Sequence, residues 1–233
     1  MSKRILAFQI AILAACAGAV MLLILNFPYP SPLVRPFLPA PLRWPEAQVK
    51  QWVEAQDFDP GYLEFFARDP DRTVPSGDNF VSPSDGLVKY VTFRDGITYL
   101  VIALSFWDVH VVRTPVAGIV RDISSEGSYY SRNDSPAELH ESFFLRGKPA
   151  PVQQVVTLST SKGLVRVRLI TSYWASRLRV WSRIGERVSK GERIGRILLG
   201  STVVFELPGQ VALSVKPGER VVGGETIVWR NSP

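Results

Sequence analysis

Near the C-terminus the chain contains two copies of one stretch, Gly185-Glu-Arg-Val-Ser-Lys-Gly-Glu-Arg-Ile194 and Gly218-Glu-Arg-Val-Val-Gly-Gly-Glu-Thr-Ile227, which lie 33 residues apart and agree at seven of ten positions. Glycine adopts positive φ angles without steric cost and is therefore common in the turns between antiparallel strands. We expect one short strand to end near Val188 and another near Val221, each followed by a glycine turn and a further strand. The repeat therefore predicts two equivalent strand-turn-strand units in one β domain.

The chain after Arg72 consists of short apolar runs separated by turn residues. Runs rich in Val, Ile and Thr alternate with Gly, Pro, Asp and Ser, at residues 87–92, 97–104, 118–123, 155–158 and 164–170. The repeat is similar to the half-barrels of biotinyl and lipoyl domains, and residues 114–120 and 207–211 fit the strand that precedes the turn in those domains. We predict a mainly β fold, namely a barrel-sandwich-hybrid-like domain of antiparallel strands over residues 72–233.

The N-terminus contains an apolar run that is suited to a membrane. Residues 5–27 carry no charge over 23 positions, and Gln9 and Asn26 are their only strongly polar members. A helix rises about 1.5 Å per residue, so this run is long enough to cross a hydrocarbon core of about 30 Å. We predict an uncleaved N-terminal transmembrane helix within a membrane anchor, residues 1–27, and a location in the cell membrane.

Cys16 offers a second interpretation of the same segment. Leu13-Ala-Ala-Cys16 has the form of a lipoprotein lipobox. Residues 17–25 stay strongly apolar, however, whereas a mature lipoprotein becomes polar after its lipidated cysteine. The anchor is therefore favoured over the lipobox.

Two further segments separate the apolar run from the β-rich part. Residues 28–45 contain seven prolines, which exclude a regular helix and predict an extended connector. Pro45 suits the first position of a helix in which Val49 and Val53 share one face. We therefore predict a segment of one or two short helices over residues 46–71.

The composition restricts the partners and the chemistry. A formal net charge of +6 and a pI near 9.6 favour an anionic partner, either acidic lipid or nucleic acid. The predicted anchor favours lipid, and no nucleic-acid partner is expected. Cys16 is the one cysteine, which excludes a disulfide within the chain. His110 and His140 are the only histidines, so no zinc site of nitrogen and sulfur ligands, and no other metal site, is predicted.

Three short constellations carry the residues that could perform chemistry. The first constellation is an aromatic-Arg-Asp-Pro segment at 65–72 that is followed by Ser82-Pro-Ser-Asp-Gly86. The second is Phe106-Trp-Asp-Val-His-Val-Val-Arg-Thr-Pro-Val-Ala-Gly118. The third is Ile197-Leu-Leu-Gly-Ser-Thr202. Each alone has a structural explanation: a turn before a strand, a core histidine, or a common loop tripeptide. No Gly-x-Ser-x-Gly elbow, P-loop, dinucleotide fingerprint or His-Glu-x-x-His occurs in the sequence.

In this order and spacing the three constellations resemble the phosphatidylserine decarboxylases, in particular their short bacterial and archaeal branch, over roughly residues 65–229. The resemblance implies a carboxy-lyase of phospholipid biosynthesis that converts phosphatidylserine to phosphatidylethanolamine. It also implies a zymogen that cuts itself by serinolysis between Gly200 and Ser201, into chains 1–200 and 201–233. Residue 201 then becomes a covalent pyruvoyl group, which is the cofactor. By the same resemblance, the catalytic domain faces the cytoplasm.

The chemistry of decarboxylation is consistent with these implications. Loss of CO₂ from an amino acid leaves a carbanion at Cα, which needs an electron sink that no ordinary side chain provides. By the resemblance, the Ser201 hydroxyl attacks the Gly200 carbonyl, which glycine leaves open to attack. The serine needs a base, and His110 supported by Asp85 is the available pair. We therefore expect Ser201, His110 and Asp85 to be the catalytic residues.

Cationic side chains are expected to bind the substrate phosphodiester. In the strand predicted around residues 174–183, alternation places Arg177, Arg179 and Trp181 on one face. A solvated basic strand explains the same pattern. We predict substrate binding by Arg113, Arg177 and Arg179. The expected partners are an anionic phospholipid and the membrane, and a homo-oligomer is compatible with the sequence.

The sequence departs from the family pattern at three places. Val112 replaces the usual Asn, residues 151–154 replace an Asn-Glu-Arg segment, and residues 172–178 fit an Ala-Gly-x-x-Ala-Arg-Arg pattern poorly. These changes leave open a paralogue that acts on another serine-containing lipid. A non-enzymatic, membrane-anchored barrel-sandwich adaptor also explains the anchor and the repeat, but it leaves the three constellations unexplained.

Overall fold

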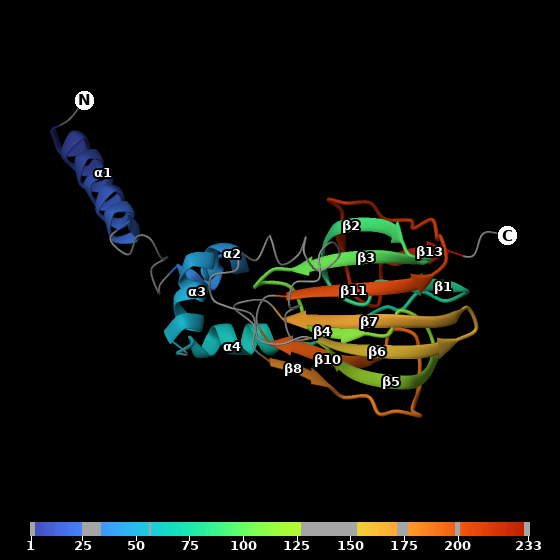
Figure 1. Cartoon of the computed structure of the whole chain (residues 1–233). Helices are drawn as coiled ribbons and strands as arrows, with labels where there is room; N and C mark the ends of the chain where they lie inside the picture. Colours follow the sequence, from blue (N-terminus) through green and yellow to red (C-terminus); the bar gives the residue numbers. More distant parts are fainter. Residues whose placement is uncertain are drawn as a thin grey trace. The chain divides into compact units, whose positions relative to one another are not determined.

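The computed structural model of the chain describes residues 3–24, 34–55, 57–126, 153–171, 177–198 and 201–230 (Figure 1). It divides the chain into two compact units, Met1–Tyr62 and Leu63–Pro233. The segment boundaries predicted at residues 27, 45 and 71 mark changes in amino-acid composition, which need not coincide with the limits of compact units. These three boundaries stay predictions.

The first unit is helical in its described parts, and this includes two short helices within residues 34–45, where the prolines predicted an extended connector. Proline is tolerated in the first turn of a helix, and both short helices have a proline there. Its elements are α1 (Lys3–Ile24), the short 3₁₀ helix η1 (Arg35–Phe37), α2 (Ala40–Arg43), α3 (Glu46–Ala55) and the start of α4 (Pro60–Ala67). Among the described residues, no helix is both long enough and apolar enough to cross a bilayer, so the predicted transmembrane helix is not confirmed.

Helix α3 buries the apolar face that its sequence spacing predicts. Val49 and Val53 are both buried. The ring of Trp44, just before the helix, meets the ring of Tyr62 edge-on, with centroids 5.7 Å apart. Asp59 caps α4 by accepting a hydrogen bond from the Tyr62 backbone N at 3.0 Å. These contacts hold residues 44–62 together as a small packed unit.

The second unit is dominated by one antiparallel sheet, which confirms the mainly β prediction. In spatial order the sheet contains β12 (Arg220–Val221), β2 (Gly86–Arg94), β3 (Ile97–Leu104), β11 (Ser201–Pro208), β7 (Gly163–Thr171), β6 (Gln153–Thr160), β5 (Gly118–Glu126) and β9 (Arg187–Val188). Figure 1 shows its longer strands side by side, curling into a half-barrel.

Two smaller sheets complete this unit. One joins β4 (Val111–Arg113), β10 (Arg193–Leu198) and β8 (Arg177–Val180), and the other joins β1 (Asn79–Val81) to β13 (Ile227–Arg230). Every strand pair in all three sheets is antiparallel. The expected strand and turn texture after Arg72 is therefore confirmed.

The sequence repeat forms equivalent edges of the large sheet. Strands β9 and β12 end at Val188 and Val221, as predicted, and they pair with β5 and β2. Gly185 and Gly218, which precede β9 and β12, have φ angles of 88° and 92°, and Gly191 and Gly224, in the turns that follow these strands, both have a φ of 80°. These values lie in the left-handed region, which glycine enters without the steric cost of a Cβ. The two copies therefore close opposite ends of the eight-stranded sheet.

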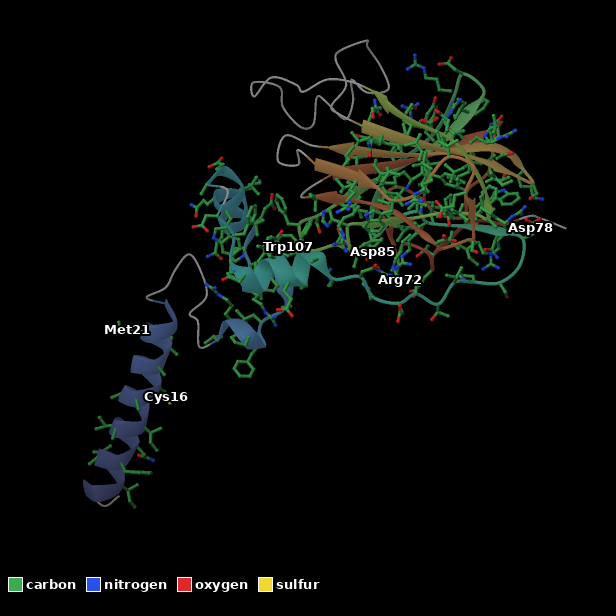
Figure 2. All side chains as sticks on the ribbon, turned by 90° about the horizontal axis from the view of Figure 1, so that it is seen from below. Cys16, Met21, Arg72, Asp78, Asp85 and Trp107 are labelled. Carbon is green, nitrogen blue, oxygen red and sulfur yellow. The ribbon has the colours of Figure 1, made fainter. Side chains whose placement is uncertain are left out.

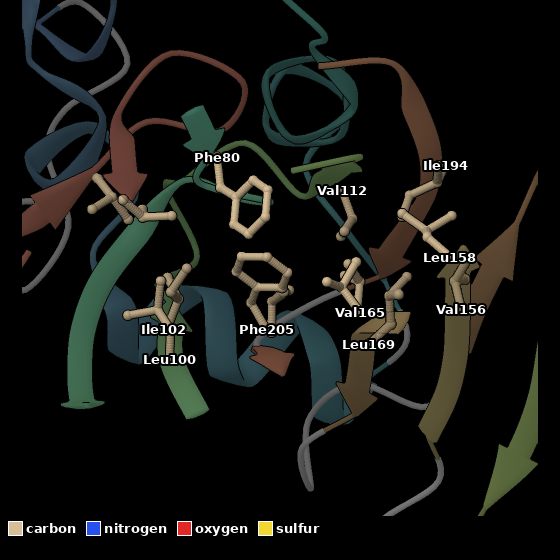
Figure 3. Packing of buried hydrophobic residues seen from close by; sticks show 14 of the residues in the cluster. Phe80, Leu100, Ile102, Val112, Val156, Leu158, Val165, Leu169, Ile194 and Phe205 are labelled. Carbon is tan, nitrogen blue, oxygen red and sulfur yellow. The ribbon is translucent and has the colours of Figure 1, made fainter. Parts of the chain in front are cut away.

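The main core lies against one face of this sheet and fixes the central strand β11 (Figure 3). Val203, Phe205 and Leu207 alternate along β11 and are almost completely buried. The ring of Phe205 meets the ring of Phe80 at a centroid distance of 5.9 Å. Burying a side chain of this size contributes about 1.5–3 kcal/mol. The strand that begins at Ser201 is therefore anchored by packing along its length.

Candidate active site

The third constellation lies at the start of the central strand. Ser201 is the first residue of β11, and its backbone is in register with Leu104 of β3 and Thr171 of β7. The position of its Cα is therefore determined by strands on both sides. Gly200 lies outside the described residues, as does Leu199.

His110 lies beside the segment that leads to Ser201. Its backbone O accepts a hydrogen bond of 3.1 Å from the N of Ile197, four residues before Ser201. The imidazole is fully buried, and the ring of Phe66 lies 4.4 Å from it, centroid to centroid. The second and third constellations, far apart in sequence, are therefore neighbours in the fold.

The hydrogen bonds of His110 define its tautomer. Nδ1 lies 3.0 Å from the backbone O of Asp108, which can only accept. A neutral imidazole in this position must therefore carry its proton on Nδ1 and leave a lone pair on Nε2. Nε2 is buried and has no hydrogen-bond partner among the described residues. Within the described parts of the chain, His110 thus offers one proton-accepting atom without a partner.

Burial keeps His110 neutral at physiological pH. Desolvation is the main cause that lowers the pKa of the imidazole to about 4, and the positive charges of Arg68 and Arg196 lower it further. The backbone O and the carboxylate of Asp108 oppose this shift. Nε2 is therefore unprotonated and available as a base near pH 7.

Asp108 organises the turn that carries His110, a role that the sequence interpretation missed. Its Oδ2 accepts hydrogen bonds of 2.7 Å from both the N and the Oγ of Ser105. Its Oδ1 forms an ion pair with Arg220 from the second copy of the repeat. The sequence contained a signal for this role, namely an aspartate two residues before the histidine, because aspartate side chains commonly stabilise turns by hydrogen bonds to nearby backbone groups.

Among the described residues, no hydrogen bond joins the carboxylate of Asp85 to the imidazole of His110. Both carboxylate oxygens of Asp85 accept hydrogen bonds from Nη2 of Arg72, at 2.9 and 3.0 Å, and Oδ1 also accepts one from the N of Gly223 at 2.8 Å (Figure 2). The predicted support of His110 by Asp85 is therefore not what the structure shows. The backbone O of Asp108 orients the imidazole instead.

The Ser-Pro-Ser-Asp-Gly segment nevertheless lies close to both other constellations. A Cβ on Gly86, whose φ is +143°, would lie 2.5 Å from the backbone O of Ala103, so only glycine fits there. Ala103 precedes Leu104, the partner of Ser201. In addition, the N of Arg113 donates to the O of Pro83 at 2.8 Å. The backbone thus brings all three constellations together at one end of β3.

The comparison with known proteins agrees with this arrangement. The family model of phosphatidylserine decarboxylase matches residues 62–229, a span that includes all three constellations. The chain belongs to the phosphatidylserine decarboxylase family. The resemblance inferred from the three constellations is therefore confirmed, and the chain is a member of a family of carboxy-lyases rather than a non-enzymatic adaptor.

Individual relatives in this family include proenzymes from bacteria and archaea. The phosphatidylserine decarboxylase proenzyme of Solibacter usitatus is 34% identical over 71% of this chain and 77% of its own length. That of Symbiobacterium thermophilum is 35% identical over 72% and 79%. A protein of Methanocaldococcus jannaschii, named as an archaetidylserine decarboxylase proenzyme, is 32% identical over 72% and 88%.

The three arginines predicted to bind substrate lie in different environments in this phosphatidylserine decarboxylase homologue. Arg113 is buried, and its guanidinium donates to Asp69 at 2.7 Å and to the O atoms of Gly191 and Pro70 at 3.1 Å. The guanidinium of Arg113 is thus already hydrogen-bonded to groups of the protein itself. The side chain of Arg177 lies outside the description, although its backbone pairs with Leu198. Arg179 is exposed.

The described residues contain no group of three or more His, Cys, Asp or Glu side chains arranged to hold a metal ion. Among the described residues in this part of the fold, the Nε2 atom of His110 can accept a proton. Such a site suits proton transfer from a nearby hydroxyl.

Proposed function

We propose that this protein decarboxylates phosphatidylserine to phosphatidylethanolamine, after it has cut its own backbone between Gly200 and Ser201. The observation that carries the proposal is the neutral, buried His110, whose Nε2 is unpartnered in the described structure and whose backbone is hydrogen-bonded to Ile197, just before the predicted cleavage point. Family membership supplies the reaction class.

In the proposed self-cleavage, His110 accepts the proton of the Ser201 hydroxyl as the oxygen attacks the Gly200 carbonyl carbon. The amide C–N bond breaks and an ester C–O bond takes its place. Elimination then removes the Cα proton of residue 201, breaks the bond between Cβ and the ester oxygen, and releases Gly200 as a carboxylate. The enamine that remains at position 201 becomes an imine by proton transfer to Cβ. Hydrolysis of the new N-terminus releases ammonia and leaves a pyruvoyl group at position 201.

The residues around position 201 fit such a group. The adjoining strands β3 and β7 fix the backbone at position 201, and Nε2 of His110 is a buried atom with no hydrogen-bond partner in the described structure. A pyruvoyl group supplies a ketone that stores the electron pair left by CO₂. His110 provides a proton-accepting atom, and Asp108 holds the imidazole in place.

Intact mass and lipid analysis test the proposal together. Denatured wild-type protein should give masses for residues 1–200 and 201–233, and Ser201→Ala should give one mass and no decarboxylation. Incubation of the wild type with phosphatidylserine in detergent should release phosphatidylethanolamine and CO₂. A folded wild type that stays as one chain would falsify the proposed mechanism.

A serine-containing lipid other than phosphatidylserine is the second candidate substrate. It is favoured by the departure at Val112 and by the relative from M. jannaschii, whose name specifies archaetidylserine. Parallel assays with phosphatidylserine and with an ether-linked archaetidylserine would separate the two. A preference of more than tenfold in kcat/KM for the ether lipid would replace the first substrate with the second.

We also propose that residues 5–27 attach the protein to the cell membrane as an anchor, with a barrel-sandwich-hybrid catalytic domain on the cytoplasmic side. The 23-residue run without a charge supports this, as do the exposed side chains of Phe8, Leu13 and Met21 on α1. Figure 2 shows Met21 on this helix. The full chain should stay with membranes in alkaline carbonate, whereas a variant lacking residues 1–33 should be extracted. Release of the full chain would contradict the anchor.

A further inference from the structure

Two arginines lie directly opposite each other on neighbouring strands of the small three-stranded sheet. Arg179 of β8 is in register with Arg196 of β10. Directly opposite residues of an antiparallel pair point to the same face, with Cβ atoms about 4.5–5.5 Å apart. Two like charges at this spacing destabilise the pair unless something neutralises them.

No carboxylate of the described residues neutralises this arginine pair. Nearby arginines have such partners: Arg193 binds Asp69 at 2.5 Å and Arg113 binds the same carboxylate at 2.7 Å. Arg196 instead donates from Nη2 to the backbone O of Ala67 at 2.9 Å, and its buried Nε has no hydrogen-bond partner within the described parts. The pair thus places two positive charges on one face, with no carboxylate partner in the described structure.

The arginine pair is adjacent to the proposed catalytic residues. Arg196 immediately precedes Ile197, whose N donates to the backbone O of His110, and it lies five residues before Ser201. The charge of Arg196 is also among the causes that lower the pKa of His110, after desolvation and the charge of Arg68. A ligand bound by this pair would therefore sit beside the reaction centre.

We propose that Arg179 and Arg196 together bind the phosphodiester of the lipid substrate. This inference rests on the proposed function, because the ligand it names is the substrate of that reaction. Guanidinium groups bind phosphate oxygens through paired N–H donors, and one phosphodiester between them would remove the repulsion of the free pair.

The neighbouring aromatic side chain suits the same ligand. The guanidinium of Arg196 lies 5.8 Å from the ring centroid of Trp181, and this indole is 38% exposed. An indole with one apolar and one polar edge is favourable at the boundary between headgroup and acyl chain. The combination of two cations and a half-exposed ring fits an anionic lipid headgroup better than a free anion.

The experiment compares Arg196→Gln and Arg179→Gln with Arg187→Gln. Arg187 is an exposed arginine at the equivalent of Arg220 in the first copy of the repeat, so its replacement removes the same charge elsewhere on the domain. Self-cleavage needs no substrate, so all three variants should give both chains by denaturing mass spectrometry. With short-chain phosphatidylserine below its micellar concentration, KM should rise about ten- to hundredfold for the first two variants and stay unchanged for Arg187→Gln.

Direct binding separates failure of this inference from failure of the proposed function. Calorimetry with glycerophosphoserine should show binding to the wild type and to Arg187→Gln, and its loss in Arg196→Gln, even if the wild type does not decarboxylate. Unchanged KM and unchanged binding in Arg196→Gln and Arg179→Gln would overturn the inference. Inorganic phosphate that binds as tightly as glycerophosphoserine would also overturn it, because the site would then not recognise the lipid headgroup.

Discussion

His110 combines complete burial with a side-chain atom that has no hydrogen-bond partner in the described structure. A buried polar atom left in this state costs about 1–3 kcal/mol. A histidine that served only to fill the core would stabilise the fold less than an apolar residue of the same size. Packing therefore does not account for the unpartnered Nε2, whereas the proposed proton transfer requires it.

Replacement of this histidine should slow self-cleavage. In His110→Ala, loss of the base is expected to reduce the rate of chain cleavage by about 10² to 10⁴, because that is the usual contribution of a general base. A time course of denaturing mass spectra measures the rate, with circular dichroism to check folding. His140, which lies outside the described residues, provides the matched control, and His140→Ala should be cut at the wild-type rate. Normal cleavage in His110→Ala would remove the imidazole from the mechanism.

The low pKa of His110 also predicts how stability depends on pH. The folded-state pKa is about 4, whereas a histidine in the unfolded chain titrates near 6.5. The unfolded state therefore binds the proton first as the pH falls, and the free energy of unfolding should decrease between about pH 6.5 and pH 4, by roughly 3 kcal/mol in total.

Urea unfolding of the uncut Ser201→Ala chain at several pH values would measure this decrease. The same series with His110→Gln added should show a flatter dependence, since glutamine does not titrate. Equal slopes for the two proteins in this pH range would mean that the imidazole is not held neutral by burial.

At the scale of elements, the Ser-Pro-Ser-Asp-Gly segment is held by a tertiary ion pair. Arg72 and Asp85 have side chains that are 10% and 17% exposed, and Gly223 donates to the same carboxylate. A Cβ on Gly223 would lie 2.9 Å from the Cα of Ser84, so the turn of the second repeat packs directly on this segment. The position of Asp85 therefore depends on residues from both ends of the β unit.

Loss of this ion pair should destabilise the fold. Asp85→Asn and Arg72→Gln are each expected to lower the free energy of unfolding by about 1–3 kcal/mol, and the double variant by less than the sum, because each single change leaves a poorly solvated partner behind. Asp95→Asn, in the exposed pair with Arg94, should change stability by no more than about 0.5 kcal/mol. Chemical unfolding of the uncut chain measures all four variants.

The same variants separate structure from catalysis at Asp85. A structural role predicts that stably folded Asp85→Asn still cuts itself. A folded but uncut Asp85→Asn, of wild-type stability, would instead support the catalytic role that the sequence suggested.

These elements also show what the sequence could predict. The repeat predicted strand ends at Val188 and Val221 because glycine turns and apolar periodicity are local properties. The partner of Asp85 was not predictable in this way. Its hydrogen bond to Gly223 joins residues 138 positions apart, and its proximity to Arg72 depends on how the chain crosses the sheet. The constellations that contain His110 and Asp85 suggested a catalytic pair, whereas in the structure Asp85 forms its ion pair with Arg72.

At the scale of the whole molecule, the proposed cleavage point separates strands that belong to the same sheets. The chain 201–233 would contain β11, β12 and β13. Strand β11 lies between β3 and β7 in the middle of the large sheet, β12 pairs with β2, and β13 pairs with β1. All four partner strands belong to the chain 1–200, so cleavage would leave every one of these hydrogen-bonded pairs intact.

The two chains should therefore remain one folded particle after cleavage. Val203, Phe205 and Leu207 of β11 would have to leave a core in which they are at most 1% exposed, at a cost of about 1.5–3 kcal/mol each, before the smaller chain could dissociate. Native mass spectrometry of the cleaved protein should give one mass for the paired chains, and denaturing conditions should give two. Dilution and gel filtration in mild detergent should not separate them. Appearance of a free 201–233 chain under these native conditions would contradict the central position of β11, because a strand paired on both sides and packed along one face cannot leave without unfolding the sheet.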